Sequence, residues 1–223
     1  PKIHNHWIES EKIDVGPYQK INVKKENFIR DVGRLIEEGY YGLNVTIPLK
    51  EDAYKYCDNT SDVARALKAV NTLIINKDGV YGDNTDPIGF EKSIANRGLN
   101  NKPCLVLGAG GSARAVVYAL THMKCEIGIY NRTRENAESL CSDLGVEATV
   151  LTEKTIGEFI RSSQLVVNTT SLGQQEGEEN NLIDFDNLNS SAHVYDLIYN
   201  PSKTTFLRHA EKNGCTVQNG LEM

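Results

Sequence analysis

One lysine and one aspartate in the first half of the sequence have side chains that could transfer a proton to a carbonyl group. Lys50 ends the string N-V-T-I-P-L-K at 44–50, and Asp86 ends the string G-D-N-T-D at 82–86. Hydride reduction of a carbonyl needs a proton donor beside the oxygen as it becomes an alkoxide. The amine of Lys50 could donate that proton in reduction and accept it in oxidation. Asp86 could orient the amine and balance its charge.

Both residues also have simpler interpretations. Lys50 could be a surface lysine at the start of a helix, and Asp86 could be the N-cap of a helix over 86–96. The pKa of the lysine is open too, because desolvation lowers it and a neighbouring carboxylate raises it. Composition and spacing alone leave these alternatives open.

A glycine-rich turn in the second half of the sequence predicts a dinucleotide site. A buried strand at 104–107 runs into G-A-G-G-S-A at 108–113 and then into a helix. Gly108 permits the tight turn, Gly110 lets the backbone approach a pyrophosphate, and Ala113 allows close packing of the helix on the strand. The helix N-terminus points N–H groups and a positive dipole end at that phosphate.

The residues after the second strand of this region favour NADP over NAD. A protein that binds NAD usually places an acidic residue there, roughly 20 residues after the turn, to bind the ribose 2′-hydroxyl. The string Asn131-Arg132-Thr133-Arg134 contains no acid. Guanidinium groups suit a 2′-phosphate. The alternative is that both arginines are solvated charges on a loop.

Composition limits the other partners. The 223 residues carry a formal net charge of −6, which argues against nucleic acid and anionic membranes. No apolar run approaches the ~20 residues of a membrane span. Five scattered cysteines without a C-x-x-C pair suit a reducing, cytoplasmic location. His4 and His6 have no further ligand cluster beside them, so we expect no metal site.

Apolar periodicity predicts the elements that must position these groups. In the first half we expect helices at 3–11, 27–38, 49–56, 61–67 and 86–96, and strands at 18–23, 42–46, 69–76 and 80–83. In the second half we expect strands at 104–107, 125–130, 147–150, 165–168, 192–196 and 215–217, and helices at 112–123, 134–144, 153–161 and 202–212. The alternation in the second half predicts a parallel sheet with helices on both faces.

We therefore expect an α/β protein with two domains. Residues 1–86 would form an N-terminal α/β substrate domain, 87–100 a connecting helix and hinge, and 101–223 a doubly wound parallel-sheet Rossmann domain that binds NADP. A ligand of such a protein reacts in the cleft between the domains. The glutamate-containing residues 173–181 are expected to form a solvated loop.

Several strings, in their order along the chain, resemble the shikimate dehydrogenase family. The matching pieces cover essentially the whole sequence. They are Pro1-x-x-His4-Asn5, N-V-T-x-P-x-K at 44–50, A-V-N-T at 69–72, G-D-N-T-D at 82–86, G-A-G-G at 108–111, N-R-T at 131–133, N-x-T-S-x-G at 168–173, Tyr195-Asp196 with Tyr199-Asn200-Pro201, and Asn219-Gly220-Leu221-x-Met223.

The resemblance implies reversible reduction of 3-dehydroshikimate to shikimate with NADPH, in aromatic amino acid biosynthesis. By family position Lys50 and Asp86 are the catalytic pair. The implied substrate-binding residues are Asn44, Thr46, Lys50, Asn71, Asp86 and Tyr199. The implied cofactor-binding residues are Gly108, Ala109, Gly110, Gly111, Ser112, Ala113, Asn131, Arg132, Thr133, Arg134, Asn168, Thr169, Thr170, Leu197, Gly220 and Met223, the last three near the nicotinamide.

The sequence departs from the family pattern in four places. A first strand with a Ser-x-Ser would precede Pro1, and a glutamine and a helix would follow Met223, so the resemblance implies truncation at both ends. Asn136 replaces the usual basic residue after the N-R-T string, which leaves Arg134 to substitute for it. Gln174 stands where methionine is more common.

Other functions remain open at this stage. A dehydrogenase of broader specificity would accept quinate or NAD. A non-catalytic sensor of NADP or of pathway metabolites would not need the pair of Lys50 and Asp86. A methylene-tetrahydrofolate dehydrogenase is a third hypothesis, but the asparagine-rich strings suit a polyhydroxylated acid better than a pterin. The expected partner is a small molecule, and the expected assembly is a monomer or a homodimer.

Overall fold

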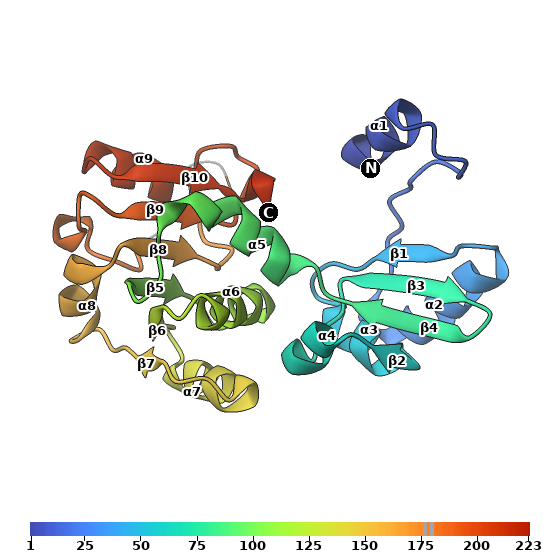
Figure 1. The fold of residues 1–223 in the computed structure, drawn as a ribbon, viewed down its shortest axis with the longest axis horizontal. Coiled ribbons are helices and arrows are strands. Elements are labelled where there is room, and N and C mark those ends of the chain that lie inside the picture. Colours follow the sequence, from blue (N-terminus) through green and yellow to red (C-terminus); the bar gives the residue numbers. More distant parts are fainter. Residues whose placement is uncertain (176–177, 179–180) are drawn as a thin grey trace. The chain divides into compact units, whose positions relative to one another are not determined.

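The computed structural model describes residues 1–175, 178 and 181–223 (Figure 1). Residues 176, 177, 179 and 180 of the loop expected at 173–181 lie outside the described part. The described chain divides into two compact units, Pro1–Tyr41 and Gly42–Met223. Among the described residues, no helix is long and apolar enough to cross a membrane.

The first unit contains α1 (Lys2–Ser10), η1 (Lys25–Asn27) and α2 (Phe28–Glu37). The expected strand at 18–23 is wrong. A strand needs a neighbouring backbone to pair with, but the backbone N–H and C=O of Tyr18 bond to the side chain of Asn5, at 2.7 and 3.0 Å. The helix expected at 27–38 is present as α2, with Phe28, Val32 and Leu35 buried.

The second unit begins with a mixed four-stranded sheet in the order β1-β3-β4-β2. Its strands are β1 (Gly42–Asn44), β2 (Asn59–Thr60), β3 (Thr72–Asn76) and β4 (Gly79–Asp83). Helices α3 (Lys50–Tyr56) and α4 (Asp62–Leu67) precede the hairpin of β3 and β4. The strands expected at 69–76 and 80–83 are present as the hairpin of β3 and β4, whereas β2 was not expected, because two residues are too few to show an alternating pattern.

A second sheet of six parallel strands follows in the order β10-β9-β8-β5-β6-β7, the strand order of a Rossmann fold. The strands are β5 (Pro103–Leu107), β6 (Glu126–Tyr130), β7 (Thr149–Val150), β8 (Leu165–Asn168), β9 (His193–Asp196) and β10 (Thr216–Asn219). The helices between them are α6 (Gly111–His122), α7 (Arg134–Leu144), α8 (Ile156–Ser162) and α9 (Thr205–Lys212). Short helices η2 (Ala95–Arg97), η3 (Phe185–Asn187) and η4 (Gly220–Glu222) complete the described elements. The expected doubly wound parallel sheet is confirmed.

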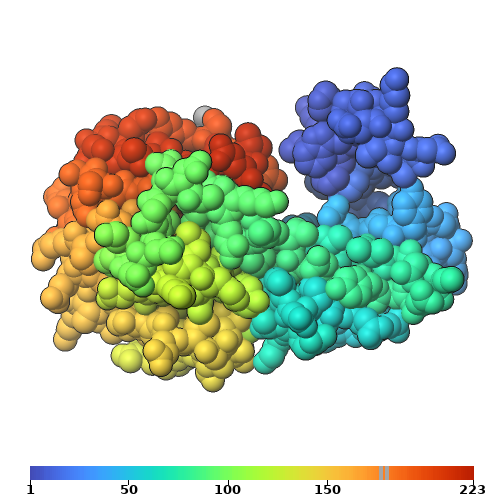
Figure 2. All heavy atoms as spheres, viewed as in Figure 1, coloured from blue at the N-terminus to red at the C-terminus, as the bar shows by residue number. Residues whose placement is uncertain are grey.

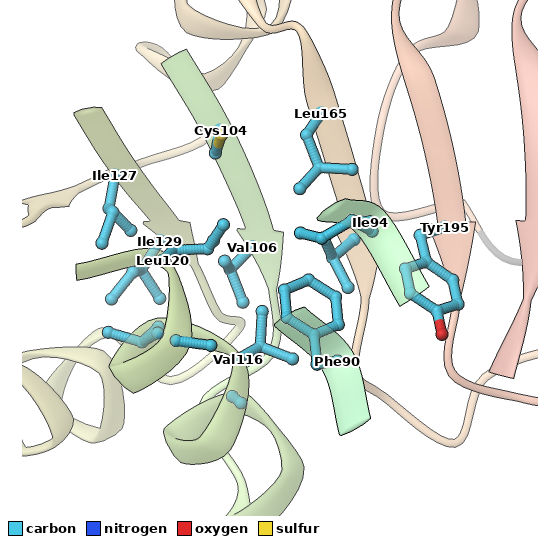
Figure 3. Close-up of a cluster of buried hydrophobic side chains, with 14 of the residues drawn as sticks. Phe90, Ile94, Cys104, Val106, Val116, Leu120, Ile127, Ile129, Leu165 and Tyr195 are labelled. Carbon is cyan, nitrogen blue, oxygen red and sulfur yellow. The ribbon is translucent and has the colours of Figure 1, made fainter. Parts of the chain in front are cut away.

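Helix α5 (Asp86–Ile94) joins the two sheets and belongs to the core of the second one. Phe90 and Ile94 are buried in that core, and the ring of Phe90 stacks on Tyr195 of β9 with 5.4 Å between centroids (Figure 3). Leu99, in the stretch expected to be a hinge, is buried in the same cluster. The first residue of α5 is therefore carried by a helix packed on the six-stranded sheet.

Helix α4 also contacts helices of the second sheet. Arg114 of α6 donates to the Leu67 carbonyl at 3.2 Å and pairs with Asp143 of α7 at 3.0 Å. Lys68 pairs with the same carboxylate at 3.3 Å. In the space-filling view the cyan atoms of this part of the chain lie directly against the yellow-green atoms of α6 (Figure 2).

Candidate active site

Lys50 and Asp86 form an ion pair. The Nζ of Lys50 lies 2.5 Å from Oδ2 of Asp86, and the side chains are only 16% and 19% exposed. Each is the first residue of its helix, α3 and α5. Among the described residues Asp86 is the one hydrogen-bond partner of the Lys50 ammonium, so two of its three N–H donors remain for a ligand oxygen.

Local hydrogen bonds fix the backbone at both helix starts. The Val70 N–H donates to the Lys50 carbonyl at 2.9 Å, which ties α3 to the chain just before β3. The Asp86 N–H donates to Oδ1 of Asn84 at 3.1 Å. Asn84 is itself buried and donates to the Ala69 carbonyl at 3.0 Å. The two members of the pair are thus anchored to the same short segment.

Asn71 holds the second oxygen of the carboxylate. Its Nδ2 donates to Oδ1 of Asp86 at 2.7 Å and to the Thr85 hydroxyl at 3.0 Å. Its Oδ1 accepts from the Thr72 hydroxyl at 2.9 Å and from the Thr85 N–H at 3.1 Å. The carboxylate therefore has one oxygen on the asparagine and the other on the lysine, which fixes its plane.

Two threonines that were not predicted as site residues complete this network. The Thr72 hydroxyl accepts from Nδ2 of Asn44 at 3.3 Å, and the Thr85 hydroxyl accepts from Asn71. Both lie inside strings already singled out, A-V-N-T and G-D-N-T-D. The sequence signal that could have identified them is a threonine directly after an asparagine, Asn71 for Thr72 and Asn84 for Thr85.

Two other expected substrate residues, Thr46 and Tyr199, lie outside this network. Thr46 is exposed, and its carbonyl accepts from the Leu49 N–H at 3.0 Å in the turn before α3. Tyr199 lies on the turn after β9 and is 62% exposed. The structure thus joins Asn44, Asn71 and the ion pair, while Tyr199 belongs to the other sheet.

The glycine-rich turn has the shape that a phosphate needs. Gly108 adopts φ +108°, and a Cβ there would lie 2.6 Å from the hydroxyl oxygen of Thr169. At Gly110 and Gly111 a Cβ would meet nothing within 4 Å, so the space at the start of α6 is open. The first N–H groups of a helix have no partner within it. Open space and free donors fit a pyrophosphate. Within this turn Ala109 and Ser112 are half-buried, and Ala113 is fully buried.

The two arginines after β6 differ in their surroundings. Arg134 pairs with Glu138 one turn along α7, at 2.7 Å. Arg132 is exposed and forms no ion pair among the described residues. The Asn131 side chain bridges the turn by donating to the Thr133 carbonyl at 2.7 Å. Arg132 is therefore the guanidinium that can take an anion without breaking another contact.

The expected cofactor residues after β8, β9 and β10 are tied into the fold. Asn168 is fully buried and accepts from the N–H and the hydroxyl of Thr170, at 3.1 and 2.7 Å. The Thr169 hydroxyl donates to the Leu107 carbonyl at 2.7 Å. Leu197 and Met223 pack against the core of the six-stranded sheet. At Gly220 any Cβ would collide with the Leu197 carbonyl.

Within the described ranges, no group of three or more His, Cys, Asp or Glu side chains is placed to hold a metal ion.

Comparison with known proteins gives a consistent result. The sequence matches the family profile of the shikimate dehydrogenase substrate binding domain over residues 1–73 and that of shikimate / quinate 5-dehydrogenase over 91–190. A protein of Roseobacter denitrificans named shikimate dehydrogenase (NADP(+)) is 40% identical over 229 aligned residues, covering 100% of this chain and 82% of that protein.

Solved structures agree with this match. Shikimate dehydrogenase from Aquifex aeolicus superposes with a TM-score of 0.90 at 31% identity, covering 100% of this chain and 81% of that one. Shikimate 5-dehydrogenase from Thermus thermophilus, in complex with NADP(H) and shikimate, gives 0.87 at 32% identity, with 100% and 82% covered.

Proposed function

This chain belongs to the shikimate dehydrogenase family, and from that premise we propose that it catalyses the reversible, NADP-dependent reduction of 3-dehydroshikimate to shikimate. The observation that carries the proposal is the ion pair of Lys50 and Asp86 with Asn71 on the second carboxylate oxygen. A binding protein has no need for a proton donor held in this way.

Lys50 is the proton donor in reduction. NADPH, when bound, supplies the hydride to the carbonyl carbon, and one N–H of the Lys50 ammonium gives its proton to the carbonyl oxygen. Asp86 aims the ammonium and compensates its charge, and Asn71 prevents the carboxylate from rotating away. In the oxidation of shikimate, the neutral amine of Lys50 takes the hydroxyl proton back.

The substrate is a polyhydroxylated acid, and polar side chains around the pair suit it. We assign its hydroxyl and carboxylate groups to Asn44, Thr46 and Asn71, with Tyr199 from the other sheet. A site built to bond hydroxyl groups rejects analogues that lack them, because its own polar groups would then stay unpaired. The small molecule is the partner that this set of residues fits.

For the cofactor we assign the pyrophosphate to the turn at 108–113 and the 2′-phosphate to Arg132. The open space at Gly110 and the free donors at the start of α6 support the first assignment. Arg132 is exposed and forms no ion pair among the described residues, which supports the assignment of the 2′-phosphate. The absence of an acid at 131–134 supports it as well. Arg134 assists only where its contact with Glu138 opens.

A cytoplasmic location and a monomer or homodimer complete the proposal. All five cysteines are free thiols in the structure, which fits a reducing compartment. Light scattering of the purified protein tests the assembly.

The test of the reaction is the absorbance at 340 nm of the purified protein with shikimate or quinate, each with NADP⁺ or NAD⁺. We expect a rise with shikimate and NADP⁺ and little with the other three combinations. A protein that binds NADPH but oxidises neither acid is instead a metabolite sensor. Comparable rates with quinate or NAD⁺ identify the broader dehydrogenase.

A further inference from the structure

Three polar side chains stand in a row at the carboxyl ends of β8, β9 and β10. Asn168 is the register partner of Asp196, and Asp196 is the register partner of Asn219. We call these three residues the strand-end row. Each accepts, at 3.1 Å, the N–H of the residue two positions further on, which are Thr170, Ile198 and Leu221.

Each of these bonds shapes the segment that leaves its strand. A side-chain oxygen that accepts the N–H two residues on closes a tight turn at its own position. The three turns open the segments that carry Thr170, Leu197 and Gly220, all expected cofactor residues. In a dinucleotide fold the second half of the sheet binds the second nucleotide, outside the carboxyl ends of its strands. The row therefore lies under the nicotinamide half of the site.

Asp196 is the centre of the row and the residue that links its neighbours. Its Oδ1 accepts from Nδ2 of Asn168 at 3.0 Å as well as from the Ile198 N–H. Its Oδ2 accepts from the Thr204 hydroxyl at 2.6 Å, and that hydroxyl caps α9 by accepting from the Leu207 N–H. One carboxylate thus joins the turn after β8, the turn after β9 and the start of α9.

This carboxylate is costly to keep. Asp196 is fully buried, and its hydrogen-bond partners in the described structure are all neutral donors. Burial raises its pKa from 3.8 to about 6. A buried charge without a cation destabilises a fold, and an asparagine would fill the same space without the charge. We therefore attribute the presence of this carboxylate to the two turns and the helix start that its hydrogen bonds hold.

We propose that Asp196 is a positioning residue for the nicotinamide half of NADP, acting through the side chain of Asn168 and the backbone N–H of Ile198. The proposal rests on the proposed function, because it takes the dinucleotide site as its ligand. In this role Asp196 does not contact the reacting atoms. Its carboxylate orients the Asn168 amide, and that amide fixes the loop at 169–172 by accepting from the N–H and the hydroxyl of Thr170.

The first test is Asp196→Asn, which keeps the size and one acceptor oxygen but removes the charge. Bonds to a charged acceptor are about twice as strong as neutral ones, so we expect the Kd of NADPH and the KM of NADP⁺ to rise roughly 3–10-fold. The KM of shikimate should stay within about twofold. Because the buried charge is gone, the unfolding midpoint at pH 7 should be unchanged or higher. Lower affinity with equal or greater stability cannot come from a general loss of structure.

The second variant, Asp196→Ala, removes both acceptor oxygens. It leaves the Asn168 amide and the Ile198 N–H unsatisfied, and we expect NADPH to bind on the order of 10–100-fold more weakly. Asparagine at this position should restore most of that loss. Where the alanine variant does not fold, the asparagine variant decides the proposal by itself.

Asp184→Asn is the matched control. Asp184 also accepts the N–H two residues on, that of Asp186 at 3.1 Å, but it caps η3 rather than a strand end. We expect its cofactor affinity to be unchanged. The proposal is overturned if folded Asp196→Asn binds NADPH as the wild type does, or if its affinities for cofactor and substrate fall in equal proportion.

NADPH binding, followed by fluorescence titration, separates this proposal from the proposed function. A wild type that binds NADPH but does not oxidise shikimate contradicts the proposed reaction and still allows the test of Asp196. A wild type that binds no NADPH overturns both.

Discussion

At the scale of single residues, the candidate site depends on a carboxylate held at both oxygens. Asp86 could be selected from its string, and so could Lys50 and Asn71. The contacts that make them act together could not, because 36 residues separate the pair along the chain. Thr72, Thr85 and Asp196 were missed for a related reason: their roles come from hydrogen bonds across strands, which no local spacing encodes.

We propose that Arg132 selects the cofactor by binding its 2′-phosphate. In Arg132→Asp the guanidinium is replaced by a charge that repels a 2′-phosphate and can accept from a 2′-hydroxyl. We expect the Kd of NADPH to rise at least ~10-fold while that of NADH changes less than ~3-fold. Fluorescence titration of both nucleotides measures this, with Arg34→Asp on α2 as a control for net charge. Equal weakening of both nucleotides means that Arg132 does not bind the phosphate.

Asp196 gives the protein a pH dependence of known sign. Its pKa is raised to about 6 in the folded state, mainly by burial, so between about pH 4 and pH 6 the folded state holds a proton that the unfolded state has lost. Stability from this group is therefore present at low pH and is lost as the pH rises to about 6. Each pH unit in this window is worth about 1.4 kcal/mol at most.

Urea unfolding of wild type and Asp196→Asn between pH 4.5 and 7.5 isolates that contribution. The free energy of unfolding of the variant, minus that of the wild type, should be largest near pH 7 and shrink toward pH 4.5. A difference that is constant across this range contradicts the raised pKa.

At the scale of elements, local sequence patterns predicted the strands of the second half of the chain better than those of the first half. Two central strands of the six-stranded sheet contain runs of buried apolar residues, Cys104–Leu107 and Leu165–Val167, and such runs are recognisable without knowing their neighbours. The stretch 18–23 has strand-like residues as well, but its backbone bonds to Asn5 instead of to a strand. Pairing partners decide such cases, and the sequence pattern does not contain them.

The turn between β5 and α6 predicts a sharp effect of one methyl group. Gly108→Ala places a Cβ at a positive φ and against the Thr169 hydroxyl. We expect a loss of about 1–3 kcal/mol of stability and clearly weaker NADPH binding. Thermal unfolding and NADPH titration measure the two effects.

Gly145→Ala is the control for the turn, because Gly145 also has a positive φ, +62°, but a Cβ there meets nothing within 4 Å. This variant should lose some stability and keep its NADPH affinity. If Gly108→Ala binds NADPH as well as Gly145→Ala does, the turn is not part of the nucleotide site.

At the scale of the whole molecule, the ion pair of Lys50 and Asp86 draws on both sheets of the second unit. Lys50 starts a helix that belongs to the four-stranded sheet, whereas Asp86 starts the helix whose Phe90 and Ile94 lie in the core of the other sheet. The sequence indicated two sheets and their order along the chain. It did not indicate that α5 packs into the second core, because the spacing of its apolar residues shows a buried face without showing the surface that covers it.

The most direct test of the account is the steady-state rate of shikimate oxidation by Lys50→Ala, with Lys55→Ala on the exposed side of the same helix as the control. Without the Lys50 amine, the proposed acceptor of the hydroxyl proton is missing, so we predict that kcat falls roughly 10²–10⁴-fold while the KM of shikimate and the Kd of NADPH stay within a few-fold. Lys55→Ala should behave as the wild type does. A Lys50→Ala variant with the kcat of the wild type would contradict the assignment of Lys50 and Asp86 as the proton-transfer pair.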